Sequence, residues 1–253
     1  MLNMGIVLGT SFVMIVLVSL TVVILIAGRV LNNLDPNTAR RRTLITGFTL
    51  TVWLAFQGIL ALQGFYIDLP EHPTRLSVAL GPGFIAILLS VFAVRRGSML
   101  VRALPLDWLT YLHTIRLPIE IVLLGLYINE MIPRVMTFEG WNYDILVGIT
   151  APVVGYLVFS SQRWPRRFGL IWNWISLALL INVVTIGLLS APTPLQQIAF
   201  DQPNQAVNFF PYNWLVTFIV PIVFVNHILS IKRLLEPEAS TVYLQSSRSP
   251  TNP

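Results

Sequence analysis

Apolar residues run along this chain in seven long blocks, separated by shorter polar or proline-containing segments. Each block is about 18 residues or longer with few charges, which is the length that an α-helix needs to cross the hydrocarbon core of a bilayer. The pattern predicts seven transmembrane helices, over residues 5–27, 44–66, 76–94, 104–133, 143–160, 168–189 and 212–231. We therefore expect an all-α integral membrane protein in which residues 1–235 form a single transmembrane domain. Residues 236–253 have the composition of a disordered tail.

Positive charges alternate between the two sides of this arrangement. The connectors after the first, third and fifth predicted helices hold clusters of arginine, and Lys232 and Arg233 follow the seventh. The connectors after the second, fourth and sixth helices have almost no excess of positive charge. Cytoplasmic loops of membrane proteins carry an excess of Lys and Arg. The N-terminus is therefore predicted to lie outside, and the C-terminus with its tail in the cytoplasm.

The composition agrees with a membrane protein and excludes some chemistry. Hydrophobic residues make up 55% of the chain and charged residues 11%, whereas soluble domains carry about 25% charged residues. The net charge of +5 lies in the connector clusters, so we expect the lipid bilayer and no nucleic acid as a partner. The chain has no cysteine, which excludes disulfides and thiolate metal sites. It also lacks an Asn-X-Ser/Thr acceptor, and both absences fit a prokaryotic inner (plasma) membrane.

The fourth block, residues 104–133, carries ionisable side chains within an otherwise apolar stretch. At about 100° per residue, His113, Arg116 and Glu120 fall within roughly 60° of one another on one helical face. Tyr127 projects from the same side. Ionisable groups in hydrocarbon are costly and usually face a bundle interior, a water-filled cavity or one another. We expect this helix to be central, with its polar stripe turned towards a cavity.

Polar side chains on other predicted helices lie at related depths. They are Gln57 on the second helix, Asn173 and Asn182 on the sixth, and Asn226 and His227 on the seventh. At a rise of about 1.5 Å per residue, Glu120 lies near the bilayer middle and Asn173, Asn226 and His227 in the cytoplasmic half, as do His113 and Arg116. Asn173 and Asn182 are about 180° apart around their helix, so only one of them is expected to face the fourth helix.

These residues also have simpler structural interpretations. Arg116 and Glu120, at positions i and i+4, can neutralise each other on one helix. Single asparagines in membrane helices often only bridge neighbouring helices. His113 and His227 are weak candidates for a site that titrates or binds a cation, and no metal or other cofactor is expected. The feature that sets the fourth helix apart is its three ionisable groups within eight residues.

Two known classes of seven-helix membrane protein can be tested against single residues. A retinal-binding rhodopsin needs a Schiff-base lysine in the middle of the seventh helix, whereas the sole lysine, Lys232, lies at the end of that helix. A zinc-dependent membrane hydrolase needs several histidines, including an HxxxH pair. This chain has His72, His113 and His227, which are far apart in the sequence. Neither class fits.

The leading hypothesis is a polytopic inner-membrane protein with a central polar cavity beside the fourth helix. It would act as a small-solute or proton-linked transporter or channel, because buried ionisable side chains mark such pathways. One alternative is a seven-helix sensor or a membrane protein that binds a lipid or small ligand in the same cavity. A membrane-embedded enzyme, with Glu120 and His113 as acid and base, is the less favoured alternative. The expected ligand is a small molecule, an ion or a lipid.

Overall fold

The computed structural model describes residues 2–67, 75–96 and 98–236, and these ranges contain helices and loops but no strand. The α-helices are α1 (Leu2–Leu34), α2 (Pro36–Leu62), α3 (Arg75–Arg96), α4 (Ser98–Arg102), α5 (Leu106–Leu112), α6 (Arg116–Ile128), α7 (Asp144–Val154), α8 (Arg166–Ser190) and α9 (Val220–Leu235). Short 3-10 or π-helical segments are η1 (His113–Ile115), η2 (Arg134–Met136), η3 (Gly155–Ser160), η4 (Ala206–Asn208) and η5 (Leu215–Ile219). The predicted tail lies outside the described residues, apart from Glu236.

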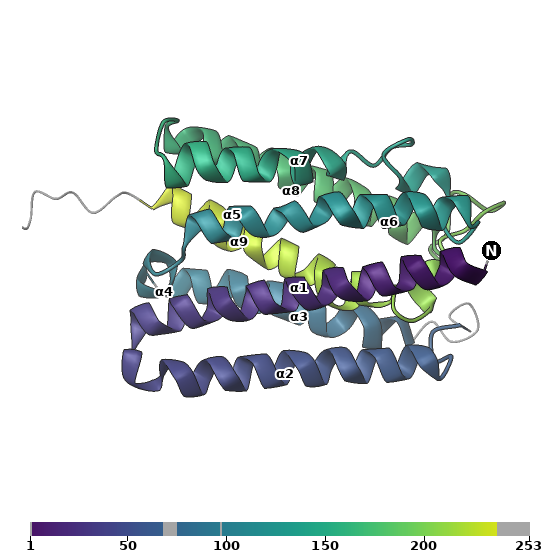
Figure 1. Ribbon diagram of the computed structural model, residues 1–253, viewed down its shortest axis with the longest axis horizontal. Helices are drawn as coiled ribbons and strands as arrows, with labels where there is room; N and C mark the ends of the chain where they lie inside the picture. The colour runs from purple at the N-terminus through teal and green to yellow at the C-terminus, as the bar shows by residue number, and fades with distance from the viewer. Residues whose placement is uncertain (1, 68–74, 97, 237–253) are drawn as a thin grey trace, which may run out of the picture.

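Within the described residues, five helical segments are long and apolar enough to cross a membrane. They are Met4–Leu34, Pro36–Leu62, Leu106–Ile128, Arg166–Ser190 and Leu215–Leu235, and the shorter apolar helices Val78–Phe92 and Asp144–Ser160 accompany them. The long helices lie side by side along the long axis of the molecule (Figure 1). Large apolar side chains such as Phe48, 72% exposed, cover their outer faces. Such a surface indicates a membrane location, so the prediction of an all-helical membrane protein is confirmed at this level.

The first connector is much shorter than predicted. Residues 29–42 were expected to be a connector, but α1 continues to Leu34 and α2 begins at Pro36. Asp35 caps α2, because its carboxylate accepts hydrogen bonds from the Asn37 N–H at 3.1 Å and the Thr38 hydroxyl at 2.6 Å. The bond from Thr38 lowers the pKa of Asp35. Proline suits the first turn, where no N–H partner is needed, so the arginines at 40–42 lie inside α2.

The central span, Leu106–Ile128, is broken by the 3-10 turn η1. Pro118 has no N–H to complete the hydrogen bond to the carbonyl four residues earlier, which lies in η1. At the break, the N–H of His113 bonds to the Thr110 carbonyl. The Leu109 carbonyl accepts a hydrogen bond of 2.7 Å from the Asn226 side chain of α9. A neighbouring helix thus satisfies a backbone group at the break, as the membrane interior requires.

The loop after α6 and the long loop after α8 fold against each other and into the bundle. The Gln202 side chain donates to the Ile132 carbonyl at 2.6 Å, and the Ala206 N–H donates to the Met131 carbonyl at 3.1 Å. Through these bonds the long loop packs against the bundle. Because the loop before it turns inwards, α7 starts short of the end of α6 (Figure 1).

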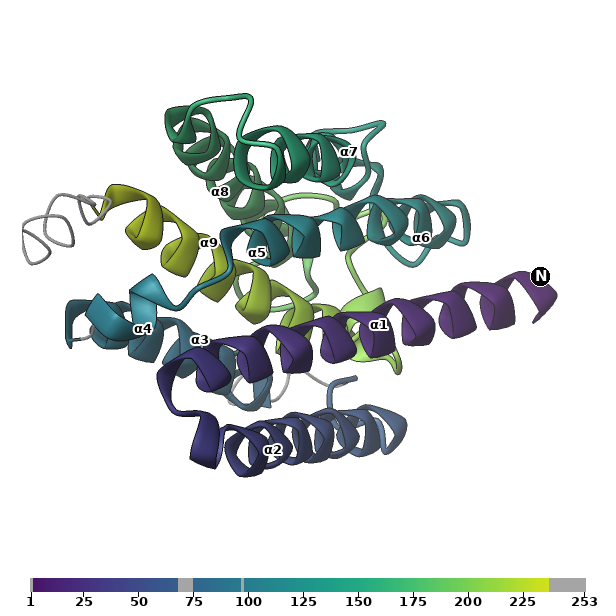
Figure 2. The ribbon, with the colours of Figure 1, turned by 60° about the vertical axis from the view of Figure 1, so that its left-hand side comes forward.

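α9 crosses the centre of the bundle and packs against α3 on one side and α8 on the other (Figure 2). Two glycines allow close approach of the helices around it. A Cβ atom on Gly83 of α3 would lie 2.4 Å from Cγ of Pro221, and one on Gly148 of α7 would lie 2.4 Å from the backbone N of Leu117. These close contacts hold α3 to the η5–α9 segment and α7 to α6.

Candidate functional site

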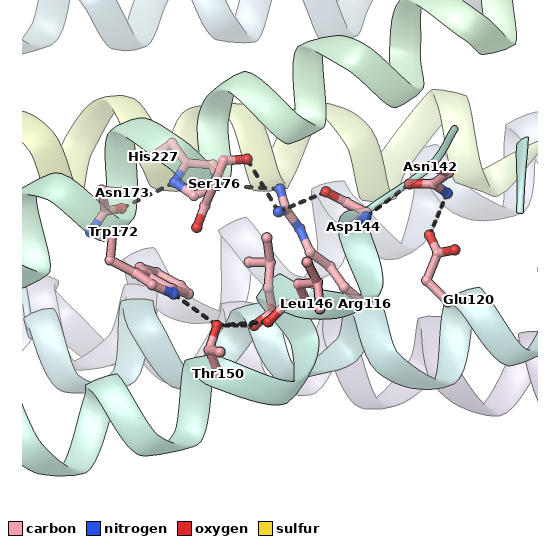
Figure 3. Close-up of polar contacts among 11 residues, drawn as sticks. Arg116, Glu120, Asn142, Asp144, Leu146, Thr150, Trp172, Asn173, Ser176 and His227 are labelled. Carbon is pink, nitrogen blue, oxygen red and sulfur yellow. Dashed lines mark hydrogen bonds and ion pairs between the residues drawn. The ribbon is translucent and has the colours of Figure 1, made fainter. Parts of the chain in front are cut away.

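Arg116 lies in the first turn of α6 at the centre of the bundle, and only 3% of it is exposed. Its Nη1 lies 3.1 Å from Oδ1 of Asp144 and donates to the Ser176 carbonyl at 3.3 Å. Its Nη2 lies 3.2 Å from Nε2 of His227 (Figure 3). The buried ion pair therefore joins α6 to α7. It replaces the pair within one helix that the spacing of Arg116 and Glu120 allowed.

Two histidines lie on the side of Arg116 towards Asn173. Nδ1 of His227 lies 3.0 Å from Oδ1 of Asn173. The amide oxygen of Asn173 can only accept a hydrogen bond, and the guanidinium group of Arg116 can only donate one. Nδ1 of His227 therefore carries the proton, and Nε2 accepts a hydrogen bond from Arg116. The His113 ring stacks on the His227 ring with centroids 4.1 Å apart, and it makes a T-shaped contact with the Trp172 ring. Both ring nitrogens of His113 are buried, and neither has a hydrogen-bond partner in the described part of the chain.

This histidine pair does not fit a metal site. Imidazole binds a metal through a lone pair in the plane of the ring, and two stacked rings direct these lone pairs along separate, nearly parallel planes. Both nitrogens of His227 also have partners already, Arg116 and Asn173. Within the described ranges, no group of three or more His, Cys, Asp or Glu residues is placed to hold a metal ion.

Glu120 lies one turn beyond Arg116 on α6 and is 2% exposed. Its Oε1 accepts a hydrogen bond of 2.7 Å from the Asn142 side chain, and Oδ1 of Asn142 accepts one of 2.9 Å from the Asp144 N–H. Oε2 of Glu120 is buried and has no hydrogen-bond partner among the residues that the structure describes. These contacts form a continuous series, which we call the charged chain: Glu120, Asn142, Asp144, Arg116, His227 and Asn173 (Figure 3).

A cavity of about 400 Å³ lies against the charged chain. Arg116, Glu120 and Asp144 contribute to one wall, and apolar side chains from α3, α8, η5 and α9 form most of the remainder. The long loop after α8 adds Thr193, Asn204, Val207 and Asn208. Phe84 of α3 also lines the cavity and is 61% exposed, so the cavity reaches the outer surface of the bundle. Its volume lies within the range of about 300–1,000 Å³ that is usual for small-molecule sites.

The structure brings together five of the nine residues that the sequence singled out. They are His113, Arg116, Glu120, Asn173 and His227. Of the two asparagines on α8, Asn173 is the buried one, and it contacts His227 of α9. Two others bond elsewhere: the Asn226 side chain donates to the Leu109 carbonyl, and the Asn182 side chain donates to the Trp141 carbonyl at 2.8 Å. Tyr127 is absent from the described cavity lining.

Gln57, the ninth residue, supports the backbone of α3. Its Nε2 donates to the Val78 carbonyl at 3.3 Å, which is the carbonyl that Pro82 leaves without its helical partner. Its Oε1 accepts a hydrogen bond of 2.5 Å from the Tyr66 hydroxyl. Burial raises the pKa of Tyr66 to about 12, so this hydroxyl keeps its proton at neutral pH. Gln57 therefore lies outside the charged chain.

Sequence reasoning missed Asn142 as a site residue and placed Asp144 near the outer surface. Both precede or begin α7, where Asn142 forms a turn with the Asp144 N–H. An Asn two residues before the start of an apolar helix is a recognisable signal for such a turn. The depth of the two residues was not recognisable, because it depends on the preceding loop folding inwards.

The model of one protein family, described as a domain of unknown function (DUF8737), matches residues 73–235, more than half of the chain. The chain belongs to this family. The DUF8737 region runs from just before α3 to the end of α9, so it contains the whole charged chain and all the described residues that line the cavity. α1, α2 and Gln57 precede it. No curated protein and no solved structure matches the chain.

Proposed function

We propose that this protein is a seven-helix inner-membrane transporter that moves a small molecule through the cavity beside α6, with proton exchange at Glu120. The observation that carries the proposal is the free Oε2 of Glu120, which is buried next to a cavity of ligand size. An ionised carboxylate in an apolar site is costly unless a proton or another positive group compensates its charge. If a proton and a substrate bind alternately to this oxygen, the movement of one across the membrane is coupled to the movement of the other.

In this proposal the two shorter apolar helices cross the membrane together with the five long ones. The segment Asp144–Ser160 spans about 25 Å at 1.5 Å per residue, and the inward-folded loop before it completes the crossing. The start of α2, the connection from η3 to α8 and the end of α9 lie together at the left of Figure 1. The start of α2 carries the arginines at 40–42, and the other two segments carry Arg163, Arg166, Arg167, Lys232 and Arg233. This supports an outer N-terminus and a cytoplasmic C-terminus.

A second candidate is a membrane protein that binds a lipid or small ligand without moving it across the bilayer. The mainly apolar wall and the exposed Phe84 on the lipid-facing side of α3 favour this candidate. An acid–base enzyme receives less support. His113 is absent from the described cavity lining. In the sequence of the central span, Arg116 lies between His113 and Glu120.

Proton flux in proteoliposomes tests the proposal. Purified protein is reconstituted with a pH-sensitive dye inside the vesicles, and small solutes of different charge are added outside. We expect at least one solute to change the internal pH with the wild-type protein. Glu120→Gln should abolish the change, because Gln fills the same space and bonds to Asn142 but cannot exchange a proton.

The matched control is Glu130→Gln, which removes an exposed carboxylate just beyond the end of the same helix. This variant should move protons like the wild type. Undiminished proton movement by folded Glu120→Gln would refute the role of this carboxylate. Binding of a solute without any flux would favour the second candidate.

A further inference from the structure

The charged side chains that line the cavity, taken over the described residues, do not balance. Two carboxylates, Glu120 and Asp144, and one guanidinium group, Arg116, line it. Asp144 is paired with Arg116 at 3.1 Å, whereas among the described residues Glu120 has only the neutral amide of Asn142 as a hydrogen-bond donor. An ionised Glu120 therefore leaves one negative charge without a partner at the cavity wall.

No other described element supplies the missing positive charge. The parts of α3, α8, η5 and α9 that line the cavity have apolar side chains or glycine. The long loop contributes Thr193, Asn204 and Asn208 as its polar lining residues, and none of these side chains titrates. The His227 ring bonds to Arg116 and Asn173 and lies beyond Arg116 from Glu120. The compensating charge must come from outside, as a proton or as part of a ligand.

An anionic ligand fits this cavity poorly. Arg116 is the cation in the lining, and its two Nη atoms already contact Asp144, the Ser176 carbonyl and His227. Its Nε is free, but a bound anion would add negative charge beside two carboxylates. An uncharged apolar ligand fits the walls yet leaves Oε2 of Glu120 without a partner.

We propose that the cavity binds a monovalent organic cation with an apolar body, held through its positive charge by Oε2 of Glu120. The cation and a proton compete for this carboxylate, so each cation that binds to protonated protein releases one proton to solvent. The apolar walls contact the body of the ligand, and Phe84 marks the side on which the cavity meets the surface. The inference names the substrate class of the proposed transporter, but the binding step does not depend on transport.

Calorimetric titration of the purified full-length protein in detergent tests this site. The probe is benzyltrimethylammonium, which cannot lose a proton, and its partner is neopentylbenzene, which has the same shape without the charge. We expect saturable binding of the cation at one site and at least about tenfold weaker binding of the uncharged probe. The anion 4-phenylbutyrate should also bind at least about tenfold more weakly than the cation. Equal binding of the charged and uncharged probes would overturn the proposal without any mutation.

Variants and pH then locate the charge. In the range where Glu120 is protonated, the affinity for the cation should fall by about tenfold for each unit by which the pH is lowered. Glu120→Gln should weaken binding by about tenfold or more and remove this dependence, while Glu130→Gln should bind as the wild type does. Cation binding that keeps its pH dependence in Glu120→Gln would overturn the assignment. Cation binding without flux in proteoliposomes would refute the proposed transport and support the cation site. Flux of other solutes without cation binding would support transport and refute the cation site.

Discussion

Arg116 and Asp144 form a buried ion pair at the centre of the molecule. Both side chains are buried, and together they join α6 to the first residue of α7. Removing one partner of a buried ion pair strands the other charge, which typically costs about 3–5 kcal/mol. Replacing both partners with apolar residues of similar volume is often nearly neutral. The pair is therefore open to a direct test of which carboxylate neutralises Arg116.

We expect Asp144→Leu to lower the free energy of unfolding by about 3–5 kcal/mol, and Arg116→Met/Asp144→Leu to recover most of that loss. The matched comparison is Arg116→Met/Glu120→Leu, which leaves Asp144 buried without its partner and should not recover. Thermal unfolding in detergent measures all of these variants. Suppose instead that Arg116→Met/Glu120→Leu regained stability and Arg116→Met/Asp144→Leu did not. Glu120, and not Asp144, would then be the carboxylate that neutralises Arg116.

The residues of the site were predictable to different extents. Helical periodicity placed His113, Arg116 and Glu120 on one face, and counting depth from the loop charges brought Asn173 and His227 to their level. Asn142 and Asp144 could not be found in this way. The count assumed that the connection before α7 lies outside the bilayer, whereas long-range backbone and side-chain bonds fold it into the bundle.

At the scale of helices, breaks in one helix are supported by polar side chains from another. Gln57 of α2 bonds to the Val78 carbonyl freed by Pro82, and Asn226 of α9 bonds to the Leu109 carbonyl beside η1. Hydropathy predicted where the apolar helices lie. The sequence analysis then interpreted these two polar residues as part of a ligand or proton pathway. The sequence cannot distinguish a side chain that supports a carbonyl from one that faces a cavity, since both are single polar residues on an apolar helix.

A double-mutant cycle between Gln57 and Pro82 tests this support. Pro82→Ala restores an N–H four residues after Val78, so the carbonyl no longer needs Gln57. We expect Gln57→Leu to destabilise the wild type more than it destabilises the Pro82→Ala protein, by about 1 kcal/mol. Thermal unfolding gives the four stabilities. Loss of the Tyr66 contact occurs in both backgrounds and cancels. A coupling near zero would show that the bond from Gln57 to Val78 does not contribute.

For the whole molecule, the match to the family divides the chain into two parts. The matched region, residues 73–235, holds the charged chain and the described cavity lining. α1 and α2 lie before it and pack closely against each other, and α1 also packs against α6. A Cβ atom on Gly125 of α6 would lie 2.4 Å from Cδ2 of Leu8, which shows how closely α1 approaches the central span. The two N-terminal helices therefore support the site from outside the matched region.

The orientation that the loop charges predict is simple to test, because the chain has no cysteine. A single introduced cysteine is the sole thiol in the chain. Gln162→Cys marks the connection after η3, beside Arg163, and Gln197→Cys marks the long loop after α8; both positions are exposed. If cytoplasmic loops carry the excess of arginine, a membrane-impermeant maleimide should label Gln197→Cys in intact cells. It should label Gln162→Cys only after the cells are permeabilised. The opposite pattern would invert the topology, and labelling of both in intact cells would mean that α8 does not cross the membrane.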